Sequence, residues 1–449
     1  MRTRTLSVIV RTLALTLVLA PLALAEPPQV NGKLETVDGL RVLTVWGSDY
    51  ERGFAHGYLL AREISDFAGK ALVDPLVVAS KEVYEQKVRT GVVGAFKFDP
   101  RYEQELEGLL AGVVSKLGHD GTHQKDLGRE MTLEDLKAAN TLADWHAFYC
   151  STFSVWGKMH DQGQIATARN LDFYRLPGIV EQQMVMVHKP SKAGRKMWVS
   201  ITWAGMIGCY TGMNEEGVTI TMHDCRPGPP SVSSGFVPRS LALRDAIETA
   251  SAASALDDVE QILRARPTMF GNNIHVSSPF TGKDIPAAVF EYDPNRKRDG
   301  GVTRRTADPD TGLPSSKSMI CTNHYLLRTQ PIVCERFDTI RASLLSLALD
   351  GKGVDRRTAF GIMHQVSQRS DGVLTAHTVY MLPNSRELYL SPATATQSAP
   401  TENVWRVRLD DLFASKEAAI KRLPPSSPAG AAPRAPGLRR SAPQQEKGQ

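Results

Sequence analysis

The chain has 449 residues, of which 42% are hydrophobic and 22% charged, and these values are typical of a globular protein with an extensive core. Its formal net charge of +5 comes from the two ends, because residues 1–25 carry three arginines and residues 424–449 carry an excess of three positive charges. The body between these ends is close to neutral, which argues against a nucleic-acid partner.

Residues 1–25 combine a basic head with a short apolar run. Three arginines precede the apolar residues 12–25, and small residues at positions 23 and 25 precede Glu26. This pattern is typical of a secretory signal peptide cut after Ala25, so we expect a secreted or periplasmic protein. The alternative is an uncleaved membrane anchor. The apolar run is shorter than the roughly 20 residues that a spanning helix needs, and we expect no stable membrane insertion.

Residues 26–149 are predicted to form a mostly helical prosegment. Residues 40–46 alternate like a short strand, and Ser48 with Glu51 forms a capping box that begins a helix with apolar residues at positions 54, 58, 61 and 64. Gly53 and Gly57 lie one turn apart on this helix, which predicts that another element packs closely against that face. Helical patterns continue over residues 102–117 and 132–145.

The pattern changes from helix to strand at Cys150. Residues 151–157 and 164–172 flank a turn at 160–163 and predict a hairpin. Further strands are predicted over residues 184–188, 197–202, 206–211, 218–223, 273–276, 287–292, 319–322, 377–382 and 387–390. Helices are predicted over residues 239–250, 255–265 (with Ser254 as its cap), 335–349 and 355–364. This order favours an α+β layered sandwich over residues 150–423, followed by a disordered tail at 424–449 that is rich in Pro, Ala and Arg.

The predicted hairpin brings a thiol near an arginine and a carboxylate. If the turn is centred on Asp161, residues whose numbers sum to about 322–323 face each other. Cys150 is then opposite Asp172 or the next residue, with Arg169 further inward, although an error of one residue would spoil this arrangement. A chain cut before Cys150 would carry an α-amine with a pKa near ~8, which is suited to act as the base for the thiol. Asp172 would hold that amine, and Arg169 would support the thiolate.

Cys150 and the segment Arg169-Asn170-Leu171-Asp172 resemble the cleavage site and first hairpin of the isopenicillin-N (penicillin) acyltransferase family of N-terminal-nucleophile hydrolases. The same pattern recurs in bile-salt hydrolases and penicillin V acylases. Segments 47–57, 212–218, 321–325 and 378–391 resemble further motifs of the acyltransferase family, so the similarity spans about residues 35–410. The resemblance implies a four-layer αββα sandwich, made as a precursor that cleaves itself before Cys150 and keeps residues 26–149 as an α chain. Tyr149 departs from the small residue usual before the nucleophile.

The resemblance also implies an oxyanion hole, for which relatives often carry an asparagine after the second hairpin strand. Residues 222–224 contain no asparagine, which leaves the backbone amide of His223 or Asp224, or the side chain of Asn273, as candidates. Residues 321–325 resemble the Thr-Asn-His motif of the family, and this motif adds Asn323 and His324 to the candidate site residues. The candidate catalytic residues are Cys150, Arg169, Asp172, Asn273 and Asn323.

The expected activity is hydrolysis or transfer at the amide bond of an acylated or peptide small molecule, through a thioester. One alternative is a conventional Cys–His thiol protease that does not cleave itself, with His223 or His324 as base. Another is an exported binding protein without activity. We expect no cofactor, and the eleven histidines show no metal-binding spacing. In an oxidising compartment Cys209–Cys225 and Cys321–Cys334 could form disulfides; the alternative is four unpaired thiols.

Overall fold

The computed structural model describes residues 28–424, except for residues 76, 79, 146–148, 227, 229, 283, 307–316, 329–332 and 371. The predicted signal peptide and almost all of the predicted tail lie outside the described residues. Within the described part of the chain, no helix is long and apolar enough to cross a membrane.

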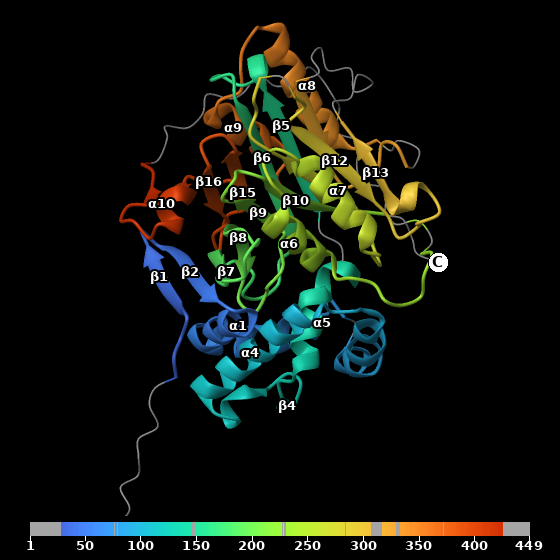
Figure 1. Cartoon of the computed structure of the whole chain (residues 1–449), viewed down its shortest axis with the longest axis vertical. Coiled ribbons are helices and arrows are strands. Elements are labelled where there is room, and N and C mark those ends of the chain that lie inside the picture. Colours follow the sequence, from blue (N-terminus) through green and yellow to red (C-terminus); the bar gives the residue numbers. More distant parts are fainter. Residues whose placement is uncertain are drawn as a thin grey trace, which may run out of the picture.

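Most of the strands belong to two large sheets (Figure 1). The nine-stranded sheet has the order β1 (Gly32–Val37), β2 (Leu40–Gly47), β7 (Gln183–Pro190), β8 (Trp198–Trp203), β9 (Thr211–Asn214), β10 (Thr219–Cys225), β11 (Gly271–Ser277), β12 (Ala287–Tyr292) and β13 (Val302–Arg305). The seven-stranded sheet has the order β14 (Ser318–Cys321), β5 (Tyr149–Trp156), β6 (Ile165–Tyr174), β15 (Val373–Leu382), β16 (Glu387–Pro392), β17 (Trp405–Arg408) and β18 (Ile420–Arg422). A small hairpin pairs β3 (His123–Gln124) with β4 (Arg129–Glu130).

Helices cover the outer faces of both sheets and produce four layers (Figure 1). Helices α6 (Arg239–Thr249) and α7 (Ala255–Ala265) pack on strands β9 to β13. Helices α8 (Glu335–Leu349) and α9 (Arg356–Gln365) pack on β14, β5, β6 and β15. The inner faces meet where β5 contacts β10, with hydrogen bonds from Thr152 to Thr221 and His223. The structure is the αββα sandwich that the sequence predicted.

The N-terminal segment is mostly helical, as expected, with α1 (Asp49–Leu59), α2 (Ala61–Leu72), α4 (Pro100–Leu117) and α5 (Leu133–Trp145). Ser48 and Glu51 form the predicted capping box of α1. Gly53 and Gly57 let α1 approach α4 closely, because a Cβ at either position would lie 1.9 Å from a backbone oxygen of α4. The segment also supplies β1 and β2, and β2 pairs in parallel with β7. Its first two strands are therefore part of the larger sheet.

Three local predictions were wrong. The strand expected over residues 206–211 begins only at Thr211, because the backbone of Ile207 and Cys209 hydrogen-bonds Asn140, Arg244 and Ser240 in place of a neighbouring strand. The helix expected across residues 48–64 is interrupted at Leu60. Ser254 stands at the start of α7, but its hydroxyl donates to Asp258 and accepts no hydrogen bond from the helix backbone. The short elements α3 (Lys81–Val83), a π-helix (Tyr84–Val92) and α10 (Leu409–Phe413) were not predicted.

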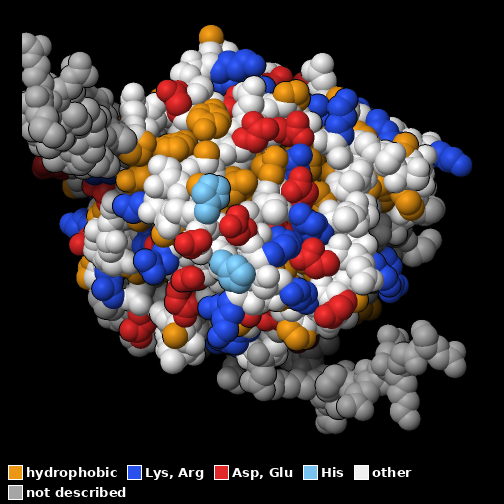
Figure 2. Space-filling model, turned by 90° about the horizontal axis from the view of Figure 1, so that it is seen from below, with side chains coloured by type: hydrophobic (Ala, Val, Ile, Leu, Met, Phe, Trp, Pro, Cys, Tyr) orange, Lys and Arg blue, Asp and Glu red, His pale blue; other side chains and the backbone are white. Residues whose placement is uncertain are grey.

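Figure 2 views the molecule from the side of the N-terminal helices. Acidic and basic side chains are interspersed with apolar ones on this face, and neither sign of charge dominates it.

Candidate active site

The hairpin of β5 and β6 sets the geometry around Cys150, and its register differs by one residue from the prediction. Cys150 faces Leu171, Thr152 faces Arg169, and Tyr149 faces Asp172. The difference arises in the connection, where a 3-10 turn (Gly157–Met159) follows β5 and the strands first pair at Trp156 and Ile165. Because side chains alternate between faces, Cys150 and Arg169 share the inner face of the hairpin, while Asp172 lies on the outer face.

Arg169 contacts the thiol directly. Its Nη2 lies 3.5 Å from Cys150 Sγ and donates to the carbonyl of Met222 at 2.9 Å. Both side chains are fully buried. Burial raises the pKa of the Cys150 thiol to about 11, although Arg169 acts in the opposite direction. The sulfur is therefore a protonated thiol at neutral pH.

A second cluster holds the backbone of Cys150. Its N–H donates to Asn323 Oδ1 at 2.7 Å, and its carbonyl oxygen accepts from Arg336 Nη1 at 2.6 Å. Arg336 Nη2 also donates to Asn323 Oδ1 at 2.8 Å, which joins the two side chains. The structure thus brings Asn323 to Cys150.

Arg336 was not found from the sequence. It lies in the first turn of α8, where a positive charge opposes the helix dipole. That placement is a weak sign of a role outside the helix. Spacing along the chain gives no sign at all, because Arg336 and Cys150 meet only through the packing of α8 on β5.

Asp172 is held on the outer face by two side chains. Its Oδ1 accepts from Thr375 Oγ1 at 2.6 Å, and its Oδ2 lies 3.6 Å from Arg336 Nη1. Oδ2 is buried and has no hydrogen-bond partner among the described residues. Burial raises the pKa of Asp172 to about 7, against the lowering effects of Arg336, Thr375 and Arg169.

Asn273 does not hydrogen-bond Cys150. Its Nδ2 donates to the carbonyls of Thr322 at 3.1 Å and His324 at 2.7 Å. These two residues flank Asn323, so Asn273 holds the loop that carries Asn323. Its Oδ1 is buried without a hydrogen-bond partner among the residues described.

Neither predicted histidine contacts the sulfur of Cys150. His223 Nε2 lies 2.7 Å from Thr152 Oγ1, and burial holds the pKa of His223 well below its usual value. His324 hydrogen-bonds Thr322 at 3.0 Å and the thiol of Cys334. Among the described residues no imidazole is hydrogen-bonded to Cys150 Sγ, which disfavours a Cys–His pair.

All five cysteines are free thiols, so the two proposed disulfides are wrong and the unpaired alternative holds. The packing agrees with this result for Cys321 and Cys334, which lie against separate core clusters.

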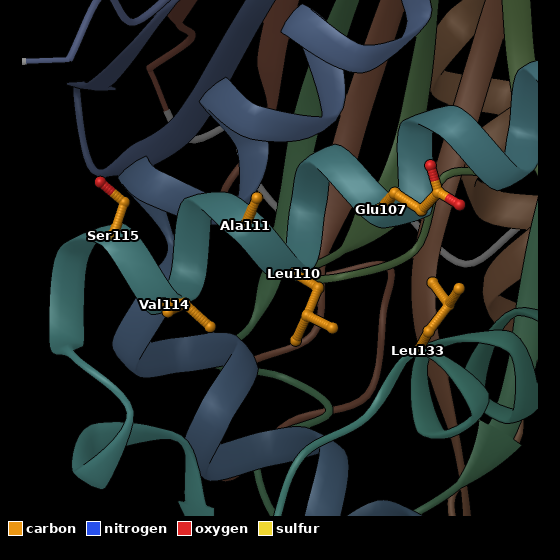
Figure 3. Close-up of a pocket in the computed structure, with 6 residues that line it drawn as sticks. All are labelled: Glu107, Leu110, Ala111, Val114, Ser115 and Leu133. Atoms are coloured by element: carbon orange, nitrogen blue, oxygen red, sulfur yellow. The ribbon is translucent and has the colours of Figure 1, made fainter.

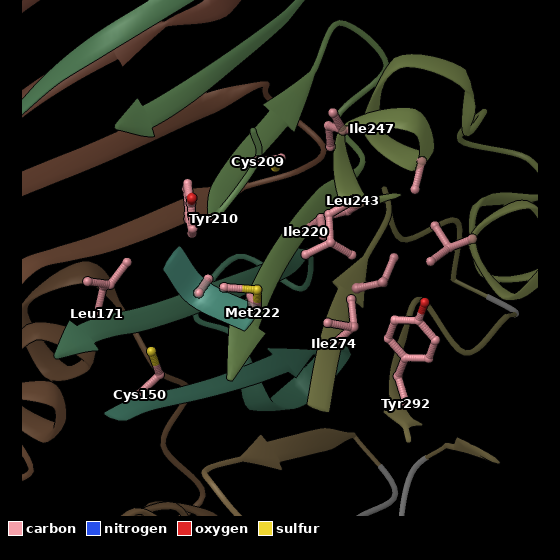
Figure 4. Packing of buried hydrophobic residues seen from close by; sticks show 14 of the residues in the cluster. Cys150, Leu171, Cys209, Tyr210, Ile220, Met222, Leu243, Ile247, Ile274 and Tyr292 are labelled. Atoms are coloured by element: carbon pink, nitrogen blue, oxygen red, sulfur yellow. The ribbon is translucent and has the colours of Figure 1, made fainter. Parts of the chain in front are cut away.

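Apolar side chains surround the sulfur. Cys150 belongs to a core cluster with Leu171, Met222 and Tyr210, which Figure 4 shows from close by. The cluster also includes Leu142 and Ala143 of α5. A separate hollow of about 460 Å³ lies on α4 and contains none of the candidate residues (Figure 3). Its lining is Glu107, Leu110, Ala111, Val114, Ser115 and Leu133.

Comparison with known proteins finds a family model that matches part of the chain. The model of the family "Acyl-coenzyme A:6-aminopenicillanic acid acyl-transferase" matches residues 158–347, a segment that includes Arg169, Asp172, Asn323 and Arg336. No curated protein matches the chain.

Three similar solved structures have low sequence identity. An N-acylethanolamine-hydrolyzing acid amidase ortholog from Caenorhabditis elegans is 18% identical and covers 52% of this chain and 93% of its own, with a TM-score of 0.39. For a conjugated bile acid hydrolase from Clostridium perfringens these values are 12%, 61%, 96% and 0.38. For penicillin V acylase from Agrobacterium tumefaciens they are 13%, 62%, 98% and 0.38. The family match confirms the resemblance of the sequence motifs over residues 158–347, where the chain is similar to the acyl-coenzyme A:6-aminopenicillanic acid acyl-transferase family.

Proposed function

We propose that this protein is an exported amide hydrolase or acyltransferase whose nucleophile is Cys150, freed when the chain cleaves itself between Tyr149 and Cys150. One observation carries the proposal: three side chains from other elements converge on the nitrogen, sulfur and carbonyl oxygen of Cys150. They are Asn323 at 2.7 Å, Arg169 at 3.5 Å and Arg336 at 2.6 Å. A thiol with only a structural role does not require its backbone to be held in this way.

The self-cleavage step is an exchange of bonds at the carbonyl carbon of Tyr149. The sulfur of Cys150 attacks this carbon, the C–N bond breaks, and the nitrogen takes the proton of the thiol and becomes the α-amine. Water then hydrolyses the resulting thioester and leaves a carboxyl group on Tyr149. Arg336 fixes the carbonyl of Cys150 during these steps, and Arg169 supports negative charge on the sulfur.

In the cleaved protein the α-amine serves as the base. With a pKa near ~8 it accepts the thiol proton at neutral pH, and the thiolate attacks the amide carbon of the substrate. The leaving amine takes a proton, and water or a second amine then releases the acyl group from the thioester. Asp172 Oδ2, a buried acceptor without a hydrogen bond, suits the role of partner for the α-ammonium group. The apolar neighbours of the sulfur suit an apolar acyl group.

The cleaved N-terminal segment is proposed to remain bound as an α chain. Glu105 of α4 is fully buried and accepts from Arg244 of α6 at 2.9 and 2.7 Å. Separation of the two chains would break these hydrogen bonds and would also unpair β2 from β7, which is unfavourable. Export rests on the signal-like residues 1–25.

The test is N-terminal sequencing and intact-mass measurement of the purified full chain, followed by assay against a panel of N-acyl amides. We expect two polypeptides, with Cys150 first in the larger one. Cys150→Ala should remain a single chain without turnover. Cys225→Ala, which alters another buried thiol, should cleave and act normally. A fully active protein that remains one uncut polypeptide would overturn the proposal.

A further inference from the structure

Among the buried arginines of the described residues, Arg169 alone forms no ion pair with a carboxylate. The other five each pair with at least one Asp or Glu; they are Arg52, Arg101, Arg239, Arg244 and Arg305. Arg169 forms none within the described part of the chain. Its hydrogen bonds go to the Cys150 sulfur, the Met222 carbonyl, the Thr211 hydroxyl and the imidazole of His377. Apart from the sulfur, these acceptors are neutral groups.

An irregularity in β15 brings His377 to Arg169. The pairing of β15 with β6 shifts between Thr375, which faces Asp172, and His377, which faces Leu171. Asp172 and Leu171 are adjacent on β6 and point to opposite faces of the sheet, so their partners Thr375 and His377 also point to opposite faces. In a regular strand, residues two positions apart share a face. The bulge therefore lets one strand bond Asp172 on the outer face through Thr375 and Arg169 on the inner face through His377.

The hydrogen bonds of His377 define a neutral imidazole. Nε2 accepts from Arg169 Nη1 at 3.2 Å and lies 2.9 Å from Thr211 Oγ1. Burial, together with the adjacent Arg169, lowers the pKa of His377 well below its usual value. A neutral ring that accepts at Nε2 carries its proton on Nδ1.

The neighbour of Nδ1 is the buried amide of Gln183. Its nitrogen lies 3.2 Å from Nδ1, and its oxygen has no hydrogen-bond partner among the residues described. Exchange of the oxygen and nitrogen of this amide lets the oxygen accept the Nδ1 proton. Gln183 thus fixes the tautomer that leaves Nε2 free to accept from Arg169.

We propose that His377 is a positioning residue: it fixes the guanidinium of Arg169 against the sulfur of Cys150 as a neutral acceptor and supplies no compensating negative charge. The positive charge of Arg169 thereby remains available to the thiolate and to charge that develops next to it. A carboxylate in the same place would hold Arg169 equally well and neutralise it. This inference rests on the proposed role of Cys150.

Other charged and titratable groups also act on the sulfur. Besides Arg169 they are Asp172 on β6, Asp224 on β10 and Cys321 on β14, while Arg336 on α8 bonds the carbonyl oxygen of Cys150. A substitution at His377 removes none of these groups, so the change in thiol titration is assigned to the pairing of Arg169 with residue 377.

The test compares His377→Gln with His377→Glu in the self-cleaved full-length protein. Glutamine retains a neutral acceptor, whereas glutamate adds a negative charge of similar size. The readout is the pH dependence of Cys150 alkylation by iodoacetamide, followed by mass spectrometry, together with kcat and KM on an N-acyl amide. An opposite charge near an ionisable group commonly moves a pKa by about 1–3 units. We expect His377→Glu to raise the apparent pKa of the thiol by about one unit or more, which lowers the alkylation rate and kcat about tenfold at neutral pH with little change in KM. His377→Gln should remain within about threefold of the wild type.

His377→Leu keeps the inference testable if the glutamate variant does not fold. It removes the acceptor without adding charge, and we expect slower alkylation that the glutamine variant restores. Equal pH profiles for the glutamate, leucine and glutamine variants in a cleaved, labelled enzyme would overturn the inference alone. A wild-type chain that is neither cut nor labelled at Cys150 would instead refute the proposed function.

Discussion

The two substitutions Glu105→Gln and Glu103→Gln, two residues apart on α4, test whether the buried ion network holds the N-terminal segment in place. Glu105 is fully buried and bonds Arg244 through both oxygens, with Arg52 at 3.3 Å. Burial opposes ionisation of Glu105, but Arg244 and Arg52 outweigh it and lower its pKa. Glu103 pairs with Lys137 at 2.8 Å, and its side chain is 42% exposed.

The expected loss in the free energy of unfolding depends on which ion pairs remain after each substitution. Removal of one partner from a buried ion pair typically costs about 3–5 kcal/mol. Arg244 keeps Glu248 at 2.8 Å and Arg52 keeps Asp49 at 2.5 Å, so we expect the lower end of this range for Glu105→Gln. An exposed pair contributes about 0–1 kcal/mol, which is the expected loss for Glu103→Gln.

The assay is urea unfolding followed by tryptophan fluorescence, in a Cys150→Ala background so that every sample is a single chain. Trp198, whose indole donates to Glu248 at 3.2 Å, reports on the network directly. Glu105→Gln should lower the free energy of unfolding by about 3 kcal/mol relative to the background. A loss below about 1 kcal/mol, equal to that of Glu103→Gln, would refute the reasoning.

Two further predictions concern a second thiol and the contact between α1 and α4. Burial acts to raise the pKa of Cys334, but hydrogen bonds from His324, Thr322 and the backbone of Phe337 outweigh it and lower the pKa to about 7. In Cys150→Ala, Cys334 should therefore be the first thiol to react with iodoacetamide, with a rate that rises through pH 7. Peptide mapping checks the site, and equal labelling of Cys334 and the other thiols would contradict the assignment. Gly57→Ala would place its Cβ 1.9 Å from the Leu109 carbonyl and should cost about 1–3 kcal/mol, whereas Gly91→Ala meets no atom within 4 Å. Differential scanning calorimetry should show a lower melting temperature for Gly57→Ala only; equal melting temperatures would contradict the close packing.

The spacing of hydrophobic residues along the chain predicted most of the helices and strands, such as β12 and α8. The register of the first hairpin was missed by one residue, because the sequence does not reveal that a 3-10 turn takes up part of the connection. The strand predicted from residue 206 failed because its backbone is bonded by helices distant in sequence.

In the candidate site, too, the residues that share a local motif could be predicted, and those brought in by tertiary packing could not. Cys150, Arg169 and Asp172 lie on one hairpin and could be found by motif, and Asn323 followed from a second motif. Arg336 and His377 reach the cysteine or its arginine only through the packing of α8 and the bulge of β15. No spacing along the chain encodes either contact.

The parallel pairing of β2 with β7 has a consequence for production of the protein. If residues 150–449 were expressed without the preceding segment, β7 would become an edge strand of the larger sheet, and the backbone groups that now hydrogen-bond β2 would be unpaired. An exposed edge strand can pair with strands of other chains and so promotes aggregation. The two pieces should therefore be made as one polypeptide or refolded together, because each supplies part of the same sheet.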